Sequence, residues 1–258
     1  ETDMSVKVEV REKGRIHHLS IDRPEKKNAL TVAMYVSMAE AIENAEKDPS
    51  ARVLLITGRG DSFTAGNDLK DFLEQPPRDM SHPVCRFISR LAATNVPIVA
   101  AVNGLAIGIG TTMLLHCDLV YASRAARFSL PFINLAVVPE AASTLLLPQV
   151  AGYRLAAELL MLGKPFDAET ALRAGLINEI CEPEKLLERA EEIARELAVK
   201  PAVALRQTKA LLKLEKQPVA DRIEAEISAF AVRVASPEAK EAFAAFMERR
   251  VPDFSKFD

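Results

Sequence analysis

The feature that most constrains the fold is an uncharged run from Leu91 to Cys117, in which an apolar segment leads into a glycine-rich turn. The segment VPIVAAVNG (96–104) is apolar at nearly every position, and so is ARVLLITG (51–58). Such strands are typical of parallel sheets covered by helices on both faces, so the two segments predict an α/β fold. The run is not expected to cross a membrane. Polar residues, a proline and three glycines interrupt the roughly 20 apolar residues that a span needs.

Strand and helix patterns alternate along the rest of the chain. Period-two alternation predicts a hairpin over 5–22, and apolar residues at helical spacing predict a helix over 31–48. The segment IGTTMLLHCD predicts a further helix over 109–118. After Glu182 the chain becomes a series of amphipathic helices punctuated by prolines, whose apolar stripes must be buried against the core, one another or another subunit.

Composition and charge exclude several classes of function. The chain of 258 residues is 49% hydrophobic and has a formal net charge of −3. It therefore has no overall positive charge that would attract nucleic acid or an anionic membrane. Its four histidines have no metal-ligand spacing, and no metal site is expected. The polar N-terminal stretch is unlike a secretory signal, and we expect a cytoplasmic location.

Two turns that contain glycine follow predicted strands, in GRGDSFTAGNDL (58–69) and VNGLAIGIGTT (102–112). Glycine permits unusual dihedral angles, and a helix that begins after Gly108 presents N–H groups without partners. Two such N–H groups that meet would form an oxyanion hole, which holds the charge on a carbonyl oxygen. Alternatively, both turns serve only tight packing. A dinucleotide site is disfavoured because the spacing is not G-x-G-x-x-G.

Glu140 is the only charged residue in the stretch FSLPFINLAVVPEAASTLLLPQVAGY (128–153). It is either an exposed turn residue with apolar neighbours or an acid shielded from water that transfers protons. The local pattern alone favours the exposed turn. In the second case, an apolar wall that includes Phe132, Val137 and Leu145 would raise the pKa of the carboxyl by desolvation and make it a better base.

Five motifs follow one another along the chain, namely IDRPEKKNALT (21–31), GRGDSFTAGNDL (58–69), PIVAAVNGLAIGIG (97–110), CDLVYASRAARFSLPFINLAVVPEAAS (117–143) and AELLMLGKPFDAETALRAGLINEI (157–180). In this order they resemble the crotonase superfamily, the enoyl-CoA hydratase/isomerase fold, along essentially the whole chain. The resemblance implies a ClpP/crotonase-like α/β superhelix of repeated β-β-α units with a C-terminal helical trimerisation region. We therefore expect a CoA-binding and catalytic core over 1–195, a helical region for oligomerisation over 196–258, and a homotrimer or a hexamer built from two trimers.

The resemblance also implies site residues. The backbone N–H groups of Asn67 and Ile109 would form the oxyanion hole, although the family more often has glycine at the second position. Lys26 could equally be a solvated charge, and Phe246 could equally belong to the core. The residues implied in binding CoA or substrate are Lys26, Ala29, Leu30, Ala65, Gly66, Asp68, Leu69, Phe132, Phe246 and Arg249.

The number of carboxylates distinguishes the reactions of this family. Its hydratases use two glutamates, at positions where this chain has Thr112 and Phe132. Its Δ3,Δ2-enoyl-CoA isomerases instead have a proline-glutamate turn, which corresponds here to Pro139-Glu140. We therefore expect an isomerase of fatty acid β-oxidation that acts on an acyl-CoA thioester without a cofactor, with Glu140 as the catalytic proton shuttle. A hydratase, another crotonase reaction on acyl-CoA, and a CoA-binding module without catalysis are the alternatives.

Overall fold

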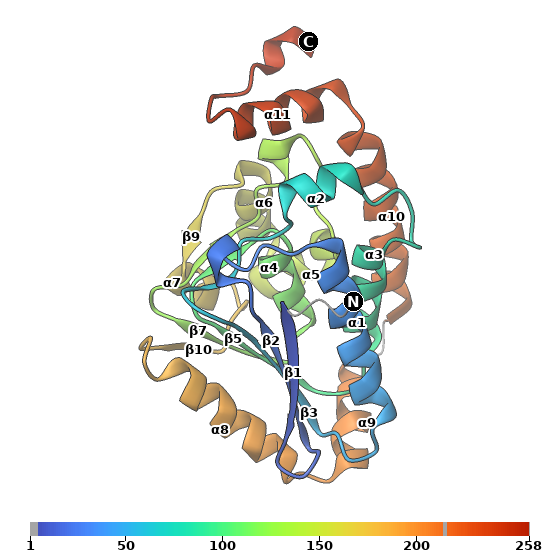
Figure 1. The fold of residues 1–258 in the computed structure, drawn as a ribbon, viewed down its shortest axis with the longest axis vertical. Coiled ribbons are helices and arrows are strands. Elements are labelled where there is room, and N and C mark those ends of the chain that lie inside the picture. The colour runs from blue at the N-terminus through green and yellow to red at the C-terminus, as the bar shows by residue number, and fades with distance from the viewer. Residues whose placement is uncertain (1–4, 214–215, 258) are drawn as a thin grey trace.

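The computed structural model describes residues 5–213 and 216–257, in which two sheets are enclosed by helices (Figure 1). Residues 1–4 of the expected core, and 214–215 and 258 of the expected helical region, lie outside this description. The larger sheet has the strand order β1-β2-β3-β5-β7-β10, and the smaller has the order β4-β6-β8-β9. The strands are β1 Val6–Arg11, β2 Ile16–Ile21, β3 Val53–Gly58, β4 Ser62–Thr64, β5 Ile98–Val102, β6 Leu105–Ile107, β7 Leu119–Ser123, β8 Arg127–Ser129, β9 Phe166–Asp167 and β10 Glu179–Cys181.

Helices cover both faces of the larger sheet, as the two continuous apolar strands predict. The first core includes alternate residues of β3 and β5, such as Leu54 and Ile98, together with α1 and α3. The second includes the residues between them, such as Leu55 and Val99, packed against α8 on the other side (Figure 1). The helices are α1 Val32–Lys47, α2 Leu69–Glu74, α3 Pro83–Ala93, α4 Ile109–Thr112, α5 Ser143–Ala151, α6 Tyr153–Leu162, α7 Ala168–Arg173, α8 Leu186–Ala198, α9 Ala202–Leu212, α10 Lys216–Val234 and α11 Pro237–Met247, with short 3-10 turns η1 Pro24–Lys26, η2 Met113–His116, η3 Ile133–Leu135 and η4 Phe254–Phe257.

The chain passes repeatedly from the larger sheet to the smaller one and then into a helical segment. The strand pairs β3–β4, β5–β6 and β7–β8 each contribute one strand to each sheet, and the strands within each set are parallel. The antiparallel β1–β2 hairpin precedes them. This arrangement confirms the predicted α/β superhelix of β-β-α units. It also brings the ends of β4 and β6, and the turns that follow them, next to each other.

One predicted helix is shorter than expected. Residues 109–118 were predicted as a single helix, but α4 ends at Thr112 and a 3-10 turn continues only to His116. Since Leu119 already begins β7, the chain must return to the sheet within a few residues, and the Cys117 N–H closes the segment by donating to Leu114 O. Across the described residues, none of the helices is both long enough and apolar enough to span a bilayer.

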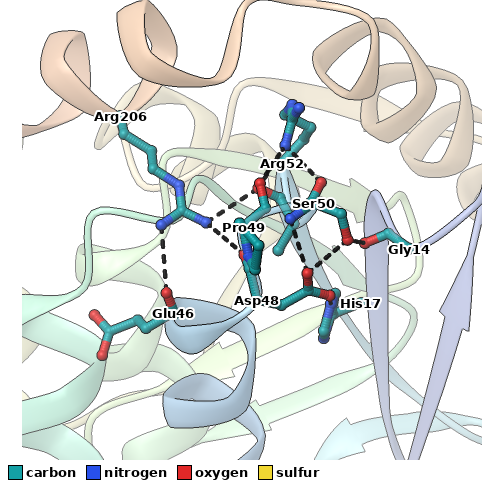
Figure 2. Close-up of polar contacts among 9 residues, drawn as sticks. Gly14, His17, Glu46, Asp48, Pro49, Ser50, Arg52 and Arg206 are labelled. Atoms are coloured by element: carbon teal, nitrogen blue, oxygen red, sulfur yellow. Dashed lines mark hydrogen bonds and ion pairs between the residues drawn. The ribbon is translucent and has the colours of Figure 1, made fainter.

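The last helices are attached to the core through α9. Arg206 donates to the carbonyl oxygens of Glu46, Asp48 and Ala51, at N–O distances of 3.4, 3.2 and 3.1 Å, where the loop after α1 leads into β3 (Figure 2). The same loop is braced by Ser50, whose hydroxyl donates to the Asp48 carboxylate. The expected boundary at residue 195 falls inside α8, which packs on the larger sheet.

A buried lysine provides the second attachment of α9. Lys209 is 3% exposed, and its Nζ lies 2.7 Å from both Val96 O and the Asp118 carboxylate. Asp118 also accepts from the Ile98 N–H at 2.7 Å. The pair therefore fixes α9 against the beginnings of β5 and β7, and this fixes where α10 and α11 start.

Lys209→Met tests this attachment. Because the substitution leaves Asp118 and Val96 O without their cationic partner, we expect the free energy of unfolding to fall by about 2 kcal/mol. Urea unfolding followed by circular dichroism measures the change. Lys185→Met is the control, because its ion pair with Glu188 is exposed to solvent and should contribute almost nothing. Equal stabilities of the two variants would contradict the assignment.

Candidate active site

A cavity of about 130 Å³ lies where the turns after β4 and β6 meet the segment before α5 and the last two helices. It brings together eight of the site residues that the resemblance implies. They are Ala65, Gly66, Asn67, Leu69, Ile109, Phe132, Glu140 and Phe246. The remaining lining residues are Phe72, Ile107, Gly108, Pro131, Leu135, Val137, Phe230 and Phe243.

The two glycine turns approach each other closely. Gly66 has φ +88°, and a Cβ atom there would lie 2.8 Å from Ile107 O, so only glycine fits without a shift of the backbone. Gly108 has φ 57° and ψ −116°, a conformation open in practice only to glycine. Ile109, in contrast, is the first residue of α4 and is not among the residues with positive φ. The isoleucine at this position therefore causes no backbone strain.

The N–H groups of Asn67 and Ile109 have no acceptor among the described residues. Leu30 pairs with the residues on either side of Asn67, since its N–H donates to Gly66 O and its carbonyl accepts from Asp68 N. Ile109 N–H stands at the first position of a helix, where no partner within the helix exists. Both residues line the cavity, so the two donors expected to form an oxyanion hole are available at one site.

Tyr35 is a site residue that the sequence analysis missed. Its hydroxyl donates to Asn67 Oδ1 at 2.5 Å, from a side chain of α1 that is 1% exposed. Burial, and next the charge of Glu140, raise the pKa of Tyr35 well above its usual value, so the hydroxyl remains a neutral donor. The only sequence signal is a tyrosine on the apolar face of a predicted helix, where a buried hydroxyl needs a partner.

Glu140 is buried in the cavity wall, with 3% of its surface exposed. Its Oε1 has no hydrogen-bond partner among the described residues. Burial, and next the charge of Glu226, raise the pKa of Glu140 to about 8. Of the two interpretations left open by the sequence, the structure therefore shows the shielded acid and contradicts the exposed turn.

The expected apolar wall is correct in two of its three members. Phe132 and Val137 are buried and line the cavity beside Glu140. Leu145 does not, because it lies on α5 and faces a separate cavity of about 630 Å³ shared with α3 and α10. The wall is completed instead by phenylalanines of α2, α10 and α11, which come from distant parts of the chain.

The turn that carries Glu140 has an unusual backbone. Ala141 and Ala142 have φ 59° and 54°, and left-handed alanines cost roughly 1–2 kcal/mol each. Two hydrogen bonds hold this turn. Ser143 Oγ donates to Glu140 O at 2.6 Å, and His116 Nε2 lies 2.8 Å from Ala141 O. Burial, and next the charge of Lys213, lower the pKa of His116 to about 4, so a neutral imidazole donates to that carbonyl.

Five expected binding residues are not among those that line the cavity, namely Lys26, Ala29, Leu30, Asp68 and Arg249. Leu30 supports the Asn67 turn, with Ala29 half-buried beside it. Asp68 caps α2 and forms an ion pair with Arg23 at 2.8 Å. Lys26 is exposed at the end of η1, and Arg249 is exposed just after α11. Phe246 is 59% exposed, which contradicts a role in the core.

The described residues contain no group of three or more metal-ligating side chains that could hold an ion. They do provide two backbone N–H donors for an oxygen that gains negative charge, and one shielded carboxyl that can exchange a proton. This combination suits a reaction at a thioester carbonyl. The donors and the carboxyl come from three separate turns, and all three line one cavity.

The chain is similar to known proteins along almost its whole length. The chain is 35% identical to 1,2-epoxyphenylacetyl-CoA isomerase of Escherichia coli (strain K12), over 95% of its own length and 96% of that protein. It is 34% identical to 2,3-dehydroadipyl-CoA hydratase of the same organism, over 93% and 95% of the two chains. A solved enoyl-CoA hydratase/isomerase from Pseudoalteromonas atlantica T6c is 42% identical, with a TM-score of 0.92 over 97% of this chain and 99% of that one.

Residues 11–256 match the family described as enoyl-CoA hydratase/isomerase. This match covers the smaller sheet, the larger sheet from the end of β1 onward, all three turns and the helices that close the cavity. The chain therefore belongs to the enoyl-CoA hydratase/isomerase family and has the crotonase fold.

Proposed function

We propose that the protein is a Δ3,Δ2-enoyl-CoA isomerase, which converts a 3-enoyl-CoA to the 2-trans-enoyl-CoA in fatty acid β-oxidation. The observation that carries this proposal is that Glu140 is the single ionisable side chain among the described residues lining the cavity. Moving a double bond from C3–C4 to C2–C3 requires one proton to leave C2 and one to arrive at C4. A single carboxylate placed over both carbons can perform both transfers without consuming water.

The backbone donors stabilise the intermediate. When the Glu140 carboxylate removes the C2 proton, the electrons pass to the thioester oxygen of a dienolate. The N–H groups of Asn67 and Ile109 would hold that charge, and losing one such donor typically costs about 10² to 10³ in rate. The protonated Glu140 then delivers its proton to C4, the electron pair returns from the oxygen, and the double bond forms between C2 and C3.

The residues at the hydratase positions support isomerisation over hydration. Thr112 is fully buried, and its Oγ1 has no hydrogen-bond partner among the described residues. Phe132 lines the cavity with an apolar ring. Neither side chain can activate water as a general base, and only one carboxyl remains in the wall.

A second candidate is favoured by the aromatic lining. Five phenylalanines line the cavity, which suits a ring, and a relative that is 35% identical isomerises 1,2-epoxyphenylacetyl-CoA. Incubation with 3-hexenoyl-CoA, 2-hexenoyl-CoA and 1,2-epoxyphenylacetyl-CoA, followed by mass spectrometry and chromatography of the products, separates the candidates. Conversion of 2-hexenoyl-CoA to a 3-hydroxy product would instead support a hydratase. Binding of CoA without turnover of any thioester would support a module without catalysis.

Glu140→Gln tests the role of the carboxyl. The amide keeps the size of the side chain but cannot accept the C2 proton, so we expect kcat for 3-hexenoyl-CoA to fall by about 10³-fold or more. Calorimetry should show that CoA binding is retained. Glu188→Gln, on the exposed side of α8, is the matched control and should keep full activity. An active Glu140→Gln enzyme would contradict the proposed proton transfer.

The pH dependence follows from the raised pKa of Glu140. Only the carboxylate accepts a proton from C2, so kcat/KM should rise tenfold per pH unit below the pKa of about 8 and level off above it. Initial rates from pH 6 to 10 measure this limb. A kcat/KM that stays constant from pH 6 to 10 would contradict a desolvated base.

The raised pKa of Glu140 should also make the folded state less stable as the pH rises. Below its ordinary pKa of 4.5 the group is protonated in both the folded and unfolded states. Between about 4.5 and 8 the unfolded chain releases the proton while the folded protein keeps it, so the folded state is progressively disfavoured as the pH rises. The wild type should therefore lose stability relative to Glu140→Gln over this interval, as measured by urea unfolding at each pH. A difference that stays constant from pH 4.5 to 8 would contradict the shift.

A further inference from the structure

The helix that follows Glu140 does not supply its own N-cap. The cap position of α5 is Ala142, which has no side-chain acceptor for the first N–H groups of the helix. A carboxylate from α10 takes this role. Thr144 donates to Glu226 Oε1 through its backbone N–H, at 3.0 Å, and also through its hydroxyl. The negative charge at a helix N-terminus is further favoured by the helix dipole.

Glu226 is buried although it lies on a helix with many exposed residues. It is 6% exposed, and its Oε2 has no hydrogen-bond partner among the described residues. Arg222, one turn earlier on α10, donates to Thr144 Oγ1 at 3.0 Å and partly balances the charge. Burying a carboxylate is costly, so a capping role alone would be served as well by an acceptor at position 142. The placement of Glu226 calls for a second role.

We propose that Glu226 is a positioning residue for the proton-transferring Glu140: it fixes the strained turn that carries this base and, through its charge, sets the pH range in which the base is ionised. The inference rests on the proposed function, in which Glu140 is that base. Glu226 does not line the cavity, and it would therefore affect the proposed reaction only through Glu140.

Glu226 is suited to hold the turn because it accepts two hydrogen bonds from Thr144, the second residue of α5. Ala141 and Ala142, between the base and this helix, are both left-handed and fully buried. Such a conformation persists only when its surroundings fix both ends. Ser143 and His116 hold the beginning of the turn, at Glu140 O and Ala141 O. Glu226 holds its end, at Thr144.

Three titratable groups near the base are neutral, whereas the cations Arg222 and Lys213 contact Thr144 Oγ1 and His116 O at 3.0 and 3.1 Å. Burial raises the pKa of Tyr35 on α1 well above its usual value, and raises the pKa of Cys85 on α3 to about 12. His116 on η2 is neutral as well, since its pKa is lowered to about 4. Glu226 holds Thr144 in the turn that carries Glu140, and after burial its charge is the second cause that raises the pKa of Glu140. Burial also raises the pKa of Glu226 itself, so the two carboxyls resist joint ionisation.

The same helix also contacts the cavity. Phe230 lies one turn after Glu226 on α10 and lines the cavity against Phe72, with ring centroids 5.8 Å apart. Residues four apart share one face of a helix. A single face of α10 therefore touches both the substrate cavity and the helix that follows the base.

Glu226→Gln separates the two roles, because its amide oxygen still accepts from Thr144 while its charge is gone. Glu226→Ala removes both, and Glu224→Gln, which is exposed on α10, is the matched control. The first readout needs no substrate. Carbon-13 NMR of glutamate carboxyls, with the Glu140 signal assigned by its loss in Glu140→Gln, gives the midpoint of Glu140 titration. We expect Glu226→Gln to lower this midpoint by about 0.5 pH unit or more, and Glu224→Gln to leave it unchanged.

The second readout is the pH profile of kcat/KM with 3-hexenoyl-CoA. Its rising limb should move to lower pH in Glu226→Gln by the same amount as the NMR midpoint. Glu226→Ala should in addition lose about tenfold or more in kcat on the plateau at high pH, because the turn is no longer held. If Glu226→Ala does not fold, Thr144→Val replaces it. This variant removes the hydroxyl contacts with Glu226 and Arg222 and keeps the N–H contact, and a loss of kcat on the plateau is again expected.

An unchanged NMR midpoint in Glu226→Gln would overturn the role of the charge. Full kcat in Glu226→Ala or in its Thr144→Val replacement would overturn the role in positioning. If the wild type converts no thioester, the proposed function fails, whereas the NMR titration still decides whether Glu226 controls the ionisation of Glu140. The two failures are therefore distinguishable.

Discussion

The site depends on one carboxyl group that is removed from water without a cationic partner. A buried carboxylate is so unfavourable that the group keeps its proton to higher pH, and Glu140 shows this with a pKa raised to about 8. A solvated acid with a pKa near 4.5 would be a poor acceptor for a proton on carbon. The apolar wall of Phe132 and Val137 is thus part of the chemistry, because it creates the base strength that the proposed reaction needs.

The fold makes this burial possible by assembling the cavity from segments far apart in the sequence. Parallel pairing of β4 with β6 sets the Gly66 and Gly108 turns side by side. The left-handed turn after Pro139 then points the carboxyl into the same space, and α10 and α11 close it with phenylalanines. Since α9 is fixed to the core by Arg206 and Lys209, the closing helices have a defined starting point.

Much of this could be predicted from the sequence. The fold could be predicted from the continuous apolar strands and the helical periodicity. The two turns could be predicted from their glycines. All of these patterns can be read from short stretches of the sequence. The resemblance of ordered motifs then identified half of the residues that line the cavity. What could not be predicted are side-chain contacts between distant residues. Tyr35 with Asn67, His116 with Ala141 and Thr144 with Glu226 are separated by 32, 25 and 82 positions. The burial of Glu140 depends on α10 and α11, so its own neighbours could not reveal it, and Leu145 was misplaced for the same reason.

At Ile109, the position of the backbone N–H does not depend on the identity of the side chain, because the residue has an ordinary helical backbone. Its donor is a main-chain N–H held by the glycine before it, whereas its side chain forms part of the cavity surface. Exchanging isoleucine for a smaller or larger apolar residue would therefore reshape the room for the acyl group while the N–H stayed in place. In directed evolution, position 109 offers a route to new acyl selectivity that leaves in place the main-chain N–H of the proposed oxyanion hole.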